Sequence, residues 1–183
     1  MLTTVLNLGR WRPSQTSRVC EVVEVDMTVI AKRLLEPIPA NRMAGVEILR
    51  AIDGHADVAL ETSEALMNVI GSLHSAGLTV LVDAAGLAAI IAAGSETDMD
   101  GIIPLGRAAT LKFLAPARGR LTASCSLTDN ARAMLDSLWS GVNDRARLST
   151  HAVVTDLTGV VVCRGSFDWS LRRTPPVASS TTA

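Results

Sequence analysis

A single carboxylate stands inside the most apolar stretch of the chain. Residues 78–94 are almost entirely apolar, and Asp83 is the only acidic residue between Glu64 and Glu96. Its sequence neighbours are leucine, valine and alanine, so we expect desolvation to raise its pKa above the usual range for aspartate. A carboxyl group with a raised pKa is suited to proton transfer near neutral pH, or to nucleophilic attack. Asp83 is therefore the first candidate for a catalytic residue.

The residues just before this stretch complete a possible reaction site. Asn68, Gly71 and His74 lead into a helix that we expect to begin at residue 75, and Gly71 allows a tight turn before it. A helix N-terminus offers unpaired backbone N–H groups and about half a positive charge, which suits a carbonyl oxygen that becomes negative during reaction. The predicted donors of this oxyanion hole are the backbone N–H groups of Ser75, Ala76 and Gly77.

The helix that positions these groups is predicted over residues 75–93, with Gly94 as its C-cap. A helix that is apolar on all sides must be surrounded either by lipid or by its own protein. Its length of about 20 residues would cross a bilayer, but a central aspartate costs roughly 2.5–3.5 kcal/mol on insertion scales. Strand-like segments also follow directly. We therefore interpret it as the buried helix of a soluble, cytoplasmic protein.

The rest of the chain alternates in the manner of antiparallel strands. We expect a short amphipathic helix at 26–37, a hairpin turning at Asp53-Gly54, and a second amphipathic helix with one apolar side formed by Ala131, Met134, Leu135, Leu138 and Trp139. The strands expected from this reading are 44–53, 55–63, 103–116, 119–129, 146–159 and 160–172, and the second helix is 130–142. Since no βαβ repeat is visible, the prediction is an α+β fold with an antiparallel sheet wrapped around the long central apolar α-helix. The predicted organisation is a flexible segment at 1–25, a single domain at 26–172 and a disordered tail at 173–183.

Composition narrows the function classes. The chain has 183 residues, 48% of them hydrophobic and 19% charged, with a net charge of −1. These values indicate one globular domain and no nucleic-acid or membrane partner. The cysteines show no CxxC spacing, so we expect free thiols in a reducing compartment: Cys20, Cys125 and Cys163. Three dispersed histidines predict no metal site, and no GxSxG, phosphate-loop or dinucleotide motif occurs.

The spacing of the chemical residues resembles that of a known family. The pattern N-x-x-G-x-x-H, with an acid nine positions after the histidine, is similar to that of hotdog-fold acyl-thioesterases, in particular the phenylacetic-acid-type branch and its DUF4442-like relatives. In this sequence the pattern falls on Asn68, Gly71, His74 and Asp83, and the terminal "FDWSLR" is also similar. The resemblance covers about residues 26–172.

The resemblance implies a hotdog fold and hydrolysis of an acyl thioester bound to coenzyme A or to an acyl-carrier protein. His74 and Asn68 would then orient the carbonyl or the water. No cofactor is implied beyond the coenzyme A or phosphopantetheine of the substrate. The assembly implied is a homodimer, or a tetramer of two such dimers.

Helix geometry predicts a shared site independently. Nine residues of helix span about 13 Å, whereas a base must lie within about 3 Å of the proton that it takes, or one water away. Asp83 is therefore too far from an oxyanion held at the start of its own helix. A second copy, related by a two-fold axis, would bring its Asp83 there.

Other interpretations stay open at this stage. Asp83 could be structural, His74 could only start the helix, and Asn68 could only cap a turn. Around Gly119, Arg118 and Arg120 either contact the phosphates of coenzyme A or lie in an ordinary solvated turn.

The helix start also departs from the family pattern. The family commonly has His-Gly-Gly, whereas here Ser75 and Ala76 follow His74, and their Cβ atoms narrow the room for a thioester. A hotdog dehydratase or cyclase, and a non-catalytic acyl-thioester-binding dimer, are the alternative functions.

Overall fold

A computed structural model describes residues 26–174. The expected flexible segment 1–25, with Cys20 in it, and residues 175–183 of the expected tail lie outside the described residues. The helices are α1 (Thr28–Leu35), α2 (Pro39–Ala44), the short 3₁₀ turn η1 (Glu64–Leu66), α3 (Ser75–Ala92) and α4 (Asp129–Trp139). The strands are β1 (Glu47–Ile52), β2 (His55–Glu61), β3 (Ile102–Phe113), β4 (Arg120–Ser126), β5 (Arg145–Asp156) and β6 (Val161–Arg173).

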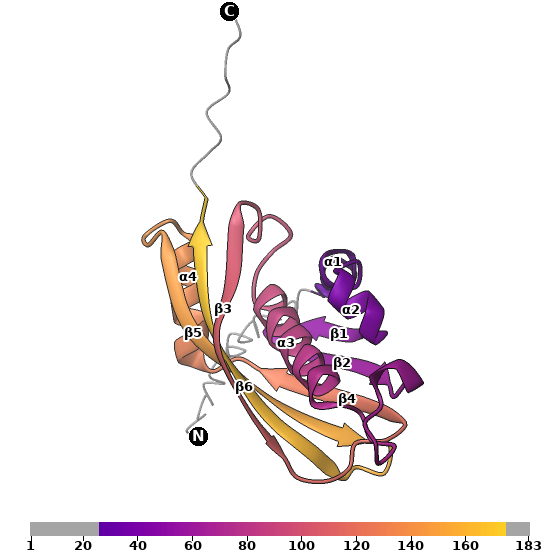
Figure 1. The fold of residues 1–183 in the computed structure, drawn as a ribbon. Helices are drawn as coiled ribbons and strands as arrows, with labels where there is room; N and C mark the ends of the chain where they lie inside the picture. The colour runs from indigo at the N-terminus through magenta and orange to yellow at the C-terminus, as the bar shows by residue number, and fades with distance from the viewer. Residues whose placement is uncertain (1–25, 175–183) are drawn as a thin grey trace, which may run out of the picture.

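The described strands form one antiparallel sheet in the order β1-β2-β4-β5-β6-β3. The β1–β2 hairpin turns at the predicted position, where Asp53 and Gly54 both have positive φ, 45° and 65°. Two consecutive positive φ angles are typical of the type I′ turn that matches the twist of paired strands. The sheet curves around α3, so the predicted α+β architecture is confirmed (Figure 1).

The central helix lies against the sheet because two glycines let it approach. A Cβ on Gly165 of β6 would lie 2.7 Å from Val82, and one on Gly86 would lie 2.5 Å from the Thr150 hydroxyl. That hydroxyl also accepts a buried hydrogen bond of 2.9 Å from the indole N–H of Trp169. The helix is long and apolar enough to cross a membrane, but most of it is buried inside the protein, as in the core helix of a soluble domain.

Two features near α3 differ from the sequence-based prediction. The short helix α2 follows α1 directly and was not predicted; it starts with Pro39, whose fixed φ suits a first helical residue. The C-cap of α3 is Ala93 rather than Gly94. Gly94 is not among the described glycines with positive φ; a Cβ there would lie 3.0 Å from the ring of Trp139, so close packing accounts for this glycine.

The remaining helix and the free cysteines follow the prediction with one exception. In α4, Ala131, Leu135 and Leu138 are buried as expected, whereas Met134 is 40% exposed. At 3.6 residues per turn, Met134 lies at the edge of the apolar side that Ala131, Leu135 and Leu138 form. Cys125 and Cys163 are both buried and free, as predicted.

Candidate active site

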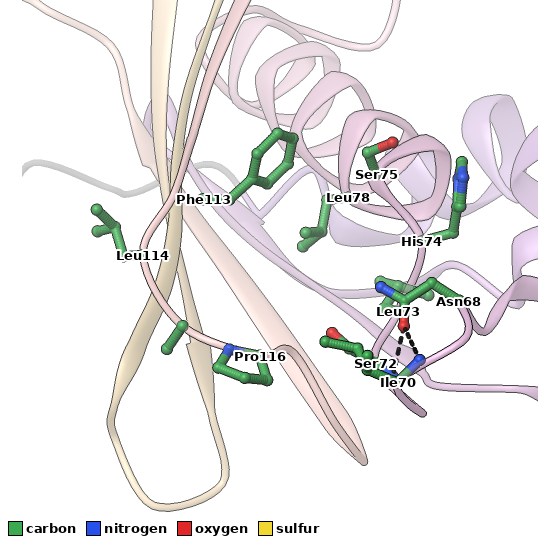
Figure 2. Close-up of a pocket in the computed structure, with 11 residues that line it drawn as sticks. Asn68, Ile70, Ser72, Leu73, His74, Ser75, Leu78, Phe113, Leu114 and Pro116 are labelled. Carbon is green, nitrogen blue, oxygen red and sulfur yellow. Dashed lines mark hydrogen bonds between the residues drawn. The ribbon is translucent and has the colours of Figure 1, made fainter.

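A pocket of about 540 Å³ lies between the start of α3 and the end of β3. One side comes from Asn68, the loop after it, His74 and Ser75, and the facing side comes from Phe113 to Pro116 (Figure 2). Leu78, one turn into α3, lies between the two sides. The structure thus brings together three of the predicted site residues at the helix start.

Asn68 shapes this pocket by holding its own loop. Its side-chain oxygen accepts hydrogen bonds of 3.1 Å from the backbone N–H groups of Ile70 and Ser72 (Figure 2). Gly71 sits in the left-handed region at φ 69°, where a side chain would be strained, so the predicted tight turn is present. Because the oxygen of Asn68 is engaged, the amide nitrogen is the part of this side chain that remains for a ligand.

His74 is the N-cap of α3, and this fixes the tautomer of its ring. Its Nδ1 accepts a hydrogen bond of 3.1 Å from the backbone N–H of Ala76. An accepting Nδ1 carries no proton, so the neutral ring carries its proton on Nε2. The exposed His74 therefore presents a hydrogen-bond donor outward, beside the start of the helix.

The three predicted backbone donors are not equivalent. The N–H of Ala76 is bonded to His74, and that of Gly77 donates to the His74 carbonyl at 2.9 Å. The Ser75 N–H has no acceptor within residues 26–174. Of the three predicted backbone donors, the geometry leaves only the Ser75 N–H free for an oxyanion; the Nε2–H of His74 is a further free donor at the helix start, beside the Ser75 hydroxyl.

Asp83 lies half-buried on α3 and does not line this pocket. Burial raises its pKa from 3.8 to about 6, which confirms the shift expected from its apolar neighbours. Its carboxylate makes no hydrogen bond or ion pair with the described residues. Since α3 is continuous from Ser75 to Ala92, the nine steps along the chain from His74 to Asp83 span about 13 Å.

The face of α3 that carries Asp83 is the one that the described chain leaves uncovered. Ser75 and Ala76 are exposed, Thr79 and Val80 are partly buried, and Asp83 continues the same stripe one turn later. Beside it, β3 pairs only with β6, and its segment 105–110 is exposed on both faces. An unpaired strand edge next to an uncovered helix stripe is a surface that a second chain can cover.

The two predicted arginines do not reach into the pocket as phosphate ligands in this structure. Arg118 donates to the carbonyls of Ile70 and Gly71, at 3.0 and 3.2 Å, and so supports the loop around Gly71. Arg120 forms an ion pair with Glu47 of β1. Arg118 thus supports the loop that forms one wall of the pocket, and Arg120 lies away from the pocket.

The facing wall and the base of the loop were missed by sequence reasoning. Ser72 ties the loop to the end of β3, because its hydroxyl accepts from the Ala117 N–H at 2.9 Å and donates to the Ala117 carbonyl. Phe113 and Leu114 are 57% and 55% exposed at the pocket mouth. The sequence signal for the facing wall was an apolar strand end followed by Pro116. Only the folded structure shows that this segment lies opposite His74. Among residues 26–174, no group of three histidine, cysteine, aspartate or glutamate residues could hold a metal ion.

Comparison with known sequences identifies one family. Residues 20–171 match the family model described as a domain of unknown function, DUF4442. None of the curated proteins compared with the chain matches it.

Solved structures share the fold at low sequence identity. A probable thioesterase from Pseudomonas aeruginosa is 23% identical, with a TM-score of 0.66 over 80% of this chain and 96% of that one. A hypothetical thioesterase from Streptococcus pneumoniae, solved with coenzyme A, is 18% identical, with a TM-score of 0.54 over 74% and 94%. The phenylacetic acid degradation protein PaaI from Thermus thermophilus, as a point mutant, is 17% identical, with a TM-score of 0.51 over 70% and 95%. These neighbours confirm the predicted hotdog fold, and the family model confirms the predicted relationship to DUF4442.

Proposed function

The chain belongs to the DUF4442 family, on the phenylacetic-acid-type branch of the hotdog-fold acyl-thioesterase superfamily, and from this we propose that it hydrolyses an acyl thioester in a site shared by two copies of the chain. The acyl carrier is coenzyme A or a carrier protein; one neighbour, the pneumococcal protein, was solved with coenzyme A. The observation that carries the proposal is Asp83. Its carboxylate has a pKa near 6 and no partner among residues 26–174, and it lies on the uncovered stripe of the helix whose N-terminus borders the pocket.

In the proposed reaction, the thioester carbonyl lies at the start of α3. The Ser75 N–H and the Nε2–H of His74 donate to its oxygen as negative charge develops there. The Asp83 carboxylate of the partner takes a proton from water, whose oxygen attacks the carbonyl carbon; the C–S bond then breaks, the proton passes from Asp83 to the leaving thiolate, and the carboxylic acid and the thiol are released. In the alternative route the carboxylate attacks that carbon itself and expels the thiolate, and water then hydrolyses the mixed anhydride to free the acid and restore Asp83. The Asn68 amide nitrogen orients the carbonyl or the water. The protein itself needs no further cofactor.

The uncovered stripe of α3 and the unpaired edge of β3 are suited to dimerisation, and this supports the proposed shared site. Pairing of two β3 edges would satisfy their free backbone groups and would set the two α3 helices antiparallel across the two-fold axis. The small residues Gly106, Ala108 and Ala109 leave room for a close approach. We propose a homodimer as the active unit, with two dimers able to form a tetramer, in the cytoplasm, where the free thiols Cys125 and Cys163 stay reduced.

The first test is a screen of acyl-coenzyme A thioesters for thiol release. Wild-type protein should turn over at least one acyl class, and Asp83→Asn should lower kcat by about 10²–10⁴-fold. Asp136→Asn, on the exposed side of α4, is the matched control and should retain full activity. Retained turnover in a folded Asp83→Asn protein would refute the assignment.

Subunit mixing tests whether the site is shared. His74→Asn keeps a residue suited to the N-cap while removing the ring, and Asp83→Asn removes the carboxylate. Each variant alone should be inactive. Because half of a randomly mixed population is heterodimer with one intact site of two, mixing should restore about a quarter of the wild-type rate. No recovery would place both residues in sites within one chain.

The dimer surface is tested by Ala109→Glu. A carboxylate on the exposed inner side of β3 should block the second chain and give a monomer by light scattering, with loss of activity and retained folding. A wild-type protein that is monomeric in solution would contradict the shared site.

A second candidate is an acyl-thioester-binding dimer without turnover. It is favoured by the engaged N–H groups of Ala76 and Gly77, which leave fewer donors than the predicted three. Calorimetric binding of an acyl-coenzyme A with no thiol release would support this candidate over hydrolysis.

A further inference from the structure

The outer side of β3, β5 and β6, opposite to α3, carries a concentration of positive charge. Residues alternate along these strands, so that Phe167, Trp169 and Leu171 point to the core while their neighbours point outward. Six outward positions are arginine or lysine, and we call this surface the basic face: Arg107, Lys112, Arg145, Arg147, Arg164 and Arg172. A single carboxylate, Asp168, lies on the same surface and accepts a hydrogen bond of 2.6 Å from Ser149.

The arrangement of these charges is unfavourable for the isolated chain. Arg145 lies directly across from Arg172, and Lys112 directly across from Arg164. Like charges in directly opposed positions of an antiparallel sheet destabilise it. The pKa of Arg145 is lowered first by desolvation and then by three neighbouring guanidinium groups, those of Arg172, Arg147 and Arg107. The carboxylate of Asp144 acts in the opposite direction and raises this pKa.

Among the described arginines outside the basic face, three form ion pairs and four do not, the latter being Arg42, Arg50, Arg118 and Arg173. Arg33, Arg120 and Arg132 each form an ion pair with a carboxylate on a neighbouring element. Within residues 26–174, none of the six cations of the basic face forms an ion pair. Since the whole chain has a net charge of −1, this positive surface is a local segregation of charge and not an effect of a basic protein.

The chemistry of the surface favours a particular occupant. Along β6, the eight steps from Arg164 to Arg172 span about 26 Å, more than a single nucleotide covers. The described aromatic residues, Phe113, Trp139, Phe167 and Trp169, belong to the inner side of the sheet or to α4, so the basic face offers no phenyl or indole ring for base stacking, and its one imidazole among the described residues is that of His151. A long nucleic acid or a lipid surface would also extend over the rest of this net-negative protein, whereas an acidic patch of limited size would not.

We propose that the basic face is a docking surface for an acidic patch on another protein, held by transient, charge-steered contacts. Guanidinium groups fit carboxylates in a planar, two-pronged geometry, and hydroxyls on the same surface, including Thr110, Ser149 and Ser166, add neutral hydrogen-bond partners. Surfaces of this kind set association rate and orientation more than affinity. The proposal does not depend on the thioesterase assignment, because the basic face lies on the opposite side of the sheet from α3.

The test uses a fluorescein-labelled oligoglutamate as the acidic polypeptide probe, with binding followed by fluorescence anisotropy. Wild-type protein should bind it at about 20 mM salt and release most of it at about 300 mM. The double variant Arg147→Ser/Arg172→Ser should bind at least about tenfold more weakly. The control Arg42→Ser/Arg50→Ser makes the same change in net charge at exposed positions on α2 and β1, and should bind as the wild type does.

Three results would overturn the proposal. Equal loss in both double variants would mean that overall charge, and not the basic face, binds the probe. Displacement of the probe by 3′,5′-ADP at equal charge would indicate a nucleotide site instead. Tighter binding of duplex DNA, or of phosphatidylserine vesicles, that is lost only in Arg147→Ser/Arg172→Ser would assign the face to nucleic acid or membrane. Thermal unfolding of each variant checks that these differences come from folded protein.

Discussion

The two sides of the curved sheet differ in the number, sign and burial of the charged groups that they carry. On the inner side, one carboxylate, Asp83, sits half-buried on α3 without a cation near enough to pair with it among the described residues. On the outer side, six cations share the surface with Asp168. In low dielectric a single charge is costly and its pKa moves, whereas in water many like charges are tolerated and act over distances of about a Debye length. The inner side therefore tunes one group for chemistry, and the outer side shapes the long-range field of the molecule.

The largest expected effect comes from breaking the inner side. Gly165→Ala places a Cβ 2.7 Å from Val82, a β-branched side chain with little rotamer freedom, so α3 must move away from β6. We expect a loss of about 1–3 kcal/mol in the free energy of unfolding, measured by urea denaturation. Gly106→Ala on the adjacent strand β3 is the matched control, since its nearest neighbour in the same chain would be at 3.8 Å. Because Gly106 lies on the proposed dimer surface, both variants are compared in the Ala109→Glu background, which is expected to be monomeric. Equal stabilities of the two variants would show that α3 does not rest on the sheet at Gly165.

The next effect isolates the charge on the inner side. The pKa of Asp83 is about 6 in the folded protein and 3.8 is its ordinary value, so between these pH values the folded state keeps a proton that the unfolded state has lost. This contribution to stability is full below about pH 4 and disappears as pH rises through 6, at a cost of about 2–3 kcal/mol. Asp83→Asn should therefore match the wild type near pH 4 and exceed it by that amount near pH 8.

Urea denaturation at several pH values measures this difference, and Asp136→Asn provides the baseline. Carboxylates with lowered pKa, such as Glu47 and Asp156, change stability in the opposite direction and cancel between the variants. A pH-independent gap between Asp83→Asn and wild type would mean that Asp83 is solvated or paired in solution.

Much of this inner side could be predicted from the sequence, because its causes are local. The apolar run predicted α3 and the raised pKa of Asp83, and the Asp53-Gly54 pair predicted the first hairpin. Local patterns did not reveal the bond from Ala76 to His74, or the ties between Ser72 and Ala117, since these depend on how the loop folds back. The short α2 was hidden because its six residues, which begin at Pro39 and end before Gly45, carry little periodic signal.

The outer side could not be predicted, for a different physical reason. Arg145 and Arg147 alternate visibly with apolar residues, as do Arg164 and Arg172, which indicates strands with one exposed side. Which strands are neighbours is set by the sheet order, with β6 between β5 and β3. Net charge sums over the whole chain, so a value of −1 conceals six cations gathered on one surface.

The smallest expected effect is a change in the salt dependence of Tm that comes from the charges on the outer side. If the cations of the basic face repel one another, added salt should stabilise the wild type, raising Tm by up to about 2 °C between low and moderate ionic strength. Arg172→Ser removes the charge opposite Arg145 and should raise Tm at low salt while flattening this salt dependence. Arg42→Ser removes an equally exposed charge outside the basic face and should keep the wild-type slope. Differential scanning calorimetry at matched pH measures all three, and identical slopes would mean that solvent already screens the basic face completely, so that its charges do not affect the stability of the fold.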